Sequence, residues 1–167
     1  MASMLAGERV QLTTVDSIAA ATATLAGATA RFDVAIIDER MVEGWLLVGD
    51  IHRRSRETQP ALAAYAMAMR ADPASAKARN THAEMLAEVG LVDEARRAYR
   101  EVAAQAPGNL KAALGANLTL PQHYDSVEHL EATRRDYARG LERLHEAVPQ
   151  FRFPNAERAL VEARWTN

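Results

Sequence analysis

The side chains most suited to acid–base or metal chemistry at neutral pH are the five histidines of this sequence, His52, His82, His123, His129 and His145. A metal site groups its ligands closely and adds carboxylates or thiolates. His123 and His129 instead straddle a turn and an expected helix start, and the sequence has no cysteine. Ser126 has no paired base, so it fits a helix cap better than a nucleophile. A glycine-rich phosphate loop is also missing. We therefore expect no catalytic residue, no metal site and no cofactor in this chain.

The composition narrows both the fold class and the kind of partner. The 167 residues are 49% hydrophobic but only 5% aromatic, and alanine supplies much of the apolar share, which favours closely packed helices over a sheet. The formal net charge of −2 argues against a nucleic-acid partner, which requires a basic surface. The sequence has no apolar run long enough for a bilayer and no signal-peptide pattern. We expect a cytoplasmic protein without a membrane segment.

An internal repeat of 34 residues defines the elements that would position any binding residue. Shifting the sequence by this step aligns Ala61 with Ala95, Tyr65 with Tyr99, and Pro73 with Pro107. Small residues let two helices approach closely, an aromatic ring fills the space between them, and proline marks the exit from a helix because it lacks an amide hydrogen. The repeating units are 42–75 and 76–109.

These units carry the signature W-x2-L-G, then A-x3-F, then P, which is typical of tetratricopeptide (TPR) repeats. In the first unit its places are taken by Trp45, Val48, Gly49, Ala61, Tyr65 and Pro73. The second unit keeps Ala95, Tyr99 and Pro107 but has Arg79 where tryptophan would stand. The sequence thus resembles the TPR family. That resemblance implies an all-α fold, a TPR α-solenoid of antiparallel helix pairs in a right-handed superhelix.

The flanking segments depart from the repeat. Residues 1–41 are expected to form N-terminal capping helices or a degenerate repeat, and 110–120 to form helix A of a third repeat that Pro121 breaks. Residues 121–167 would be a linker and capping helices. They include a long amphipathic helix from about 126 to 148, with Asp125 as an acidic cap three residues before Glu128, and a last helix near Asn155. The apolar stripe of the long helix makes a homodimer through terminal helices an open alternative.

The TPR resemblance also implies that a polypeptide partner lies in a concave groove built from the A helices. By register, the polar groove residues are Asp50, Arg53, Lys77, Asn80, Glu84 and Lys111. Lys77 and Asn80 match part of the pattern that clamps a peptide carboxylate, but Asp50 would repel that group, so we expect a different ligand. Asn80 is expected to hydrogen-bond a peptide backbone. Arg53 belongs to a basic cluster that would complement a helix end or contact an anionic peptide.

A second resemblance covers residues 110–167. Leu120-Pro121-Gln122-His123-Tyr124-Asp125-Ser126, followed by Arg134-Arg135, Tyr137 and Gly140-Leu141, is similar to the segment that follows the TPRs in bacterial SPINDLY-type proteins. These proteins are relatives of O-linked N-acetylglucosamine transferases. The resemblance implies that this chain is the non-catalytic, acceptor-binding region of a protein O-glycosyltransferase whose catalytic lobes would follow residue 167. The alternative is a stand-alone TPR adaptor or assembly scaffold without enzymatic activity.

Overall fold

The computed structural model describes residues 41–153 together with Asn155 and Glu157. The chain divides into two units, Met1–Ile36 and Ile37–Asn167, and every described residue belongs to the second. The expectations for residues 1–40 and for a last helix near Asn155 fall outside this part. Six α-helices and one short 3-10 helix make up the described region: α2 (Val42–Arg54), α3 (Thr58–Ala71), α4 (Ala76–Glu88), α5 (Val92–Gln105), α6 (Leu110–Leu118), α7 (Val127–Ala147) and η1 (Val148–Gln150).

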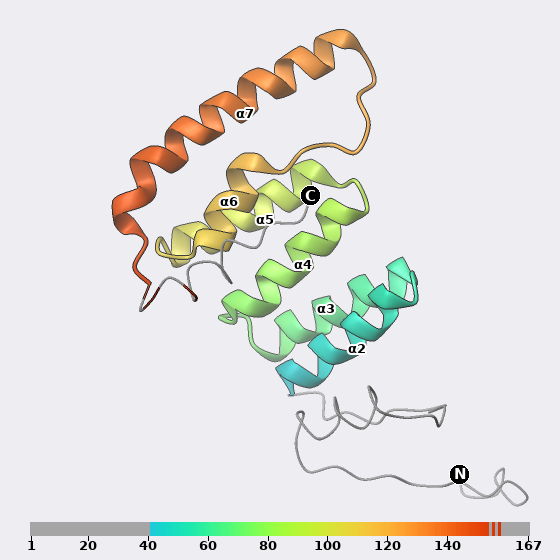
Figure 1. Ribbon diagram of the computed structural model, residues 1–167. Coiled ribbons are helices and arrows are strands. Elements are labelled where there is room, and N and C mark those ends of the chain that lie inside the picture. The colour runs from blue at the N-terminus through green and yellow to red at the C-terminus, as the bar shows by residue number, and fades with distance from the viewer. Residues whose placement is uncertain (1–40, 154, 156, 158–167) are drawn as a thin grey trace, which may run out of the picture. The chain divides into compact units, whose positions relative to one another are not determined.

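The helices form antiparallel neighbours in chain order, and the described residues contain no strand (Figure 1). Each helix from α2 to α6 packs on the next one, and α2 also contacts α4, as α4 contacts α6. Helices α2, α4 and α6 therefore form one layer, which is the arrangement of A helices in a TPR solenoid. The predicted all-α fold class is confirmed. The pairs α2–α3 and α4–α5 fall inside the ranges 42–75 and 76–109.

Polar caps and one glycine set the ends of the A helices. The Ser75 Oγ accepts a hydrogen bond from the Ala78 amide at 3.2 Å, and the Asn109 Oδ1 accepts one from the Ala112 amide at 2.9 Å. Each cap satisfies an amide that the first helical turn leaves without a backbone partner. Gly90 joins α4 to α5 with a φ of 83°, a conformation that side chains with a Cβ rarely adopt.

Two tyrosine rings fill the core between the helix layers, as the repeat predicts. Tyr65 and Tyr99 are both 0% exposed. A Cβ added to Gly49 would lie 2.2 Å from the Tyr65 Cε1, so the ring rests directly on the backbone of α2. Tyr99 makes the same approach to Gly115 of α6, where an added Cβ would lie 2.3 Å from its Cδ2. Asn117, which lies one repeat length after Ala83, faces α7, where its Oδ1 accepts a hydrogen bond from Arg143 at 2.8 Å.

Helix α7 packs on α6, where helix B of a third repeat would stand. Its expected range of 126–148 agrees with the observed Val127–Ala147. Of the two expected capping residues, Asp125 is wrong and Ser126 is confirmed, because the Ser126 Oγ accepts the hydrogen bond from the His129 amide. Leu144 of the apolar stripe is buried with Ala113 and Leu118. The break at Pro121 therefore lengthens the connection between α6 and α7 but leaves the two helices packed.

Candidate functional site

The candidate site is the A-helix surface, which we define by the charged residues Glu43, Asp50, Arg53, Lys77, Glu84, Glu88 and Lys111 on α2, α4 and α6. Arg53 of α2 donates through Nε to the Glu88 carboxylate of α4 at 2.8 Å. Its Nη2 also reaches Glu84 at 3.3 Å. Glu84 in turn accepts from the Lys111 Nζ of α6 at 2.5 Å. Three consecutive A helices are thus joined by one chain of opposite charges.

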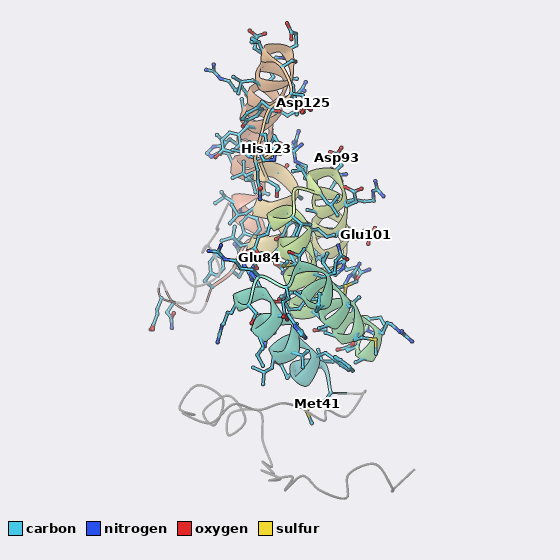
Figure 2. All side chains as sticks on the ribbon, turned by 90° about the vertical axis from the view of Figure 1, so that its right-hand side faces the viewer. Met41, Glu84, Asp93, Glu101, His123 and Asp125 are labelled. Atoms are coloured by element: carbon cyan, nitrogen blue, oxygen red, sulfur yellow. The ribbon has the colours of Figure 1, made fainter. Side chains whose placement is uncertain are left out.

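Glu84, which is labelled in Figure 2, contacts both Arg53 and Lys111, and its side chain is only 16% exposed. Burial by itself raises the pKa of a carboxyl group because it disfavours the charged form. The hydrogen bonds and positive charges of Lys111 and Arg53 outweigh that effect and lower the pKa of Glu84 below its ordinary value. The carboxylate is therefore ionised at neutral pH and holds both cations in place.

The remaining charged residues of the A-helix surface are Lys77, Glu43 and Asp50, and they are held by different contacts. Lys77 of α4 and Glu43 of α2 form an ion pair at 2.5 Å, and their side chains are 64% and 50% exposed. Asp50 is held from the other layer, because the Tyr65 hydroxyl donates to its Oδ1 at 2.8 Å. Burial and this hydrogen bond raise the pKa of the Tyr65 phenol. The Lys77–Glu43 pair is thus an exposed part of the surface, whereas Asp50 accepts a hydrogen bond from the other helix layer.

Asn80 lies on α4 between Lys77 and Glu84, but it is buried. It is 6% exposed, and its Nδ2 donates to the Asn109 Oδ1 at 3.2 Å. Its own Oδ1 is buried and has no hydrogen-bond partner in the described part of the chain. This position suits a side chain that links α4 to the N-terminal cap of α6 better than one that contacts a bound peptide. The expected role of Asn80 in peptide binding stays a prediction.

Sequence reasoning missed the part that Glu88 plays. It lies four residues after Glu84 on α4, and residues at this spacing share one face of a helix. That spacing was the available signal. The partner, Arg53, is 35 residues away along the chain, just beyond the repeat length. Arg53 lies in the last turn of α2, which agrees with the helix-end expectation for this residue, and it also pairs with Glu88.

There is no group of three or more histidine or acidic side chains that could hold a metal ion in the described part of the chain. Between residues 41 and 153, no helix combines the length and apolar character that a bilayer-spanning segment needs.

The successive helix pairs of the described residues form a solenoid of the TPR type. Among solved structures, the chain is similar to the TPR domain of Arabidopsis OM64, with 17% identity and a TM-score of 0.50 over 75% of this chain and 94% of that one. A crystal structure of MamA matches with 18% identity and a TM-score of 0.54, over 68% of this chain and 61% of that one. A second MamA structure matches with 16% identity and a TM-score of 0.52, over 78% and 62%.

The chain therefore covers about three fifths of the MamA chains that it matches. At these identities the similarity concerns the fold alone. No protein-family model and no curated protein sequence matches the chain.

Proposed function

We propose that this chain binds an extended segment of a partner polypeptide along the A-helix surface. The observation that carries the proposal is the chain of charges that runs without a break across α2, α4 and α6. Such a surface offers both donors and acceptors at repeated intervals, which suits an extended peptide with its own alternating polar groups. Lys77 and Glu43 form an exposed ion pair, so a bound peptide can replace this contact more easily than the less exposed pairs of the surface.

A displayed library of random peptides tests this proposal, because selection from such a library requires no identified partner. Peptides selected on the full chain are expected to bind the double variant Lys77→Ala/Lys111→Ala at least about tenfold more weakly, since two charge-assisted hydrogen bonds are lost. The matched control is Arg97→Ala/Arg100→Ala, which removes the same charge from exposed positions on α5. Equal binding to the wild type and both variants would contradict the proposal.

We further propose that this chain is the acceptor-binding region of a SPINDLY-like protein O-glycosyltransferase. This proposal rests on the residues from Leu120 to Leu141. Two of these, Tyr137 and Gly140, also have a packing role, because Tyr137 contacts the α6–α7 core and Gly140 lies against the backbone of Asn117. A stand-alone adaptor remains the alternative function. The open reading frame after Asn167 separates them: several hundred further residues of alternating strands and helices support the enzyme, and a stop codon removes it.

A homodimer through the terminal helices stays a proposal as well. Part of the apolar stripe expected over residues 126–148 is covered by α6. Two of its members, Leu141 of α7 and Val148 of η1, are 47% and 57% exposed. Sedimentation over a wide concentration range tests it, and a monomer at the highest concentration would exclude it. The cytoplasmic location expected from the sequence likewise stays a prediction.

A further inference from the structure

A polar cleft separate from the A-helix surface lies where three segments meet. The turn from α4 to α5, the connection over residues 121–125 and the first half of α7 enclose a volume of about 440 Å³. Figure 2 shows Asp93 of α5 near His123 and Asp125 of the connection, all three of which line this cleft. We call it the connection cleft.

Hydrogen bonds from two side chains hold the walls of the connection cleft in place. The Arg96 guanidinium donates to the Thr119 carbonyl through Nη2 at 2.7 Å and Nε at 3.1 Å. The Gln122 Nε2 donates to the Glu88 carbonyl at 2.6 Å. These bonds tie the connection to α5 and to the end of α4. The cleft is therefore built into the fold, and a ligand would not have to organise it.

The lining of the cleft is acidic. Asp93 and Glu94 lie exposed in the first turn of α5 and form no ion pair with the described residues. Asp125 faces His129 with 3.4 Å between the carboxylate and Nδ1. The cationic residue of the lining, Arg96, directs its guanidinium to the Thr119 carbonyl. Asp93 and Glu94 also complement the positive end of α5, but that role needs neither a cleft nor Asp125.

Thr133 provides a second, independent indication of a ligand. It lines the cleft from α7 and is 7% exposed. Its hydroxyl forms no hydrogen bond with the part of the chain that the structure describes. A cationic donor in the cleft would supply the hydroxyl with a charge-assisted hydrogen bond.

We propose that the connection cleft binds a lysine or arginine side chain of a partner polypeptide. The ammonium or guanidinium group pairs with Asp93, Glu94 and Asp125 and donates to the Thr133 hydroxyl, while the aliphatic stem lies against the α4–α5 turn. This site is independent of the A-helix surface, so either can exist without the other.

Amide shifts of the ¹⁵N-labelled full chain, titrated with pentalysine, test the proposal. We expect shifts at residues 90–96, 121–125 and 129–133. The double variant Asp93→Asn/Glu94→Gln should weaken binding by about fivefold, as expected for two partly exposed charge pairs. Thr133→Val, which keeps the shape of the side chain, should weaken it by about threefold.

The matched control is Glu142→Gln/Glu146→Gln, which removes the same charge from exposed positions at the far end of α7 and should leave the affinity unchanged. An equal loss in both double variants, or shifts confined to α2, α4 and α6, would overturn the connection cleft but leave the proposed function intact. Spermine serves as a second probe. Shifts at the cleft with spermine and none with pentalysine would overturn a polypeptide as the ligand.

Discussion

Gly140 of α7 lies directly against the backbone of α6, so replacing it with alanine tests the packing of these two helices. An added Cβ would lie 2.4 Å from the carbonyl oxygen of Asn117. That oxygen belongs to the backbone of α6 and cannot rotate away as a side chain would. The two helices would have to separate by about 1 Å to restore ordinary contact, and a gap of that size forfeits much of the dispersion energy between the packed side chains.

The magnitude follows from two opposing effects. Overpacking at a tight contact costs about 1–3 kcal/mol, whereas replacing glycine by alanine within a helix stabilises it by about 0.5–1 kcal/mol. We expect Gly140→Ala to lower the free energy of unfolding by about 1–2 kcal/mol. For a chain of this size the midpoint of thermal unfolding should fall by about 3–8 °C.

Thermal unfolding followed by circular dichroism gives the stability, and amide hydrogen exchange shows whether the loss is local to α7. The control is Ala138→Gly, at an exposed position of the same helix, which should cost about 0.5–1 kcal/mol from helix propensity alone. If Gly140→Ala instead stabilises the protein by the amount that Ala138→Gly costs, the two helices do not pack as described.

Three further perturbations address the core and the A-helix surface. Ala61 is 0% exposed, so Ala61→Leu should destabilise the first helix pair by about 1–3 kcal/mol through overpacking, while leucine at the exposed Ala63 should not. Tyr65→Phe removes the donor to Asp50 and should cost about 1–2 kcal/mol in urea unfolding, and an unchanged midpoint would show that this bond is not made. The pKa of Glu84 is lowered in the folded state, so its contribution is present above its ordinary pKa of 4.5 and is lost on acidification below that value. Wild type should therefore lose more stability than Glu84→Gln between about pH 6 and about pH 3, and parallel curves would contradict the ion-pair chain.

The fold could be predicted because the repeat places small and aromatic residues where geometry requires them. Gly49 faces Tyr65 directly, and a larger residue there has no room. The start of α7 was predicted within one residue, but the sequence offered both Asp125 and Ser126 as its cap, because both are good capping residues. Only the backbone conformation at this turn decides between them.

The charged contacts were harder to predict than the helices. The sequence indicated that Arg53, Glu84 and Lys111 share a surface, but not that Glu84 bridges the other two. That bridge depends on how far α2, α4 and α6 are rotated about their axes, and a single sequence does not encode this in a readable pattern. Asn80 shows the same limit, because the sequence did not indicate that its Nδ2 donates to the Asn109 Oδ1.

Hydrogen exchange on the full chain, with and without a library-selected peptide, tests the central claim most directly. Peptide binding along the A-helix surface should slow exchange in α2, α4 and α6 and leave α3, α5 and α7 nearly unchanged. Protection confined to α3, α5 or α7 would contradict the claim that this surface is the binding site.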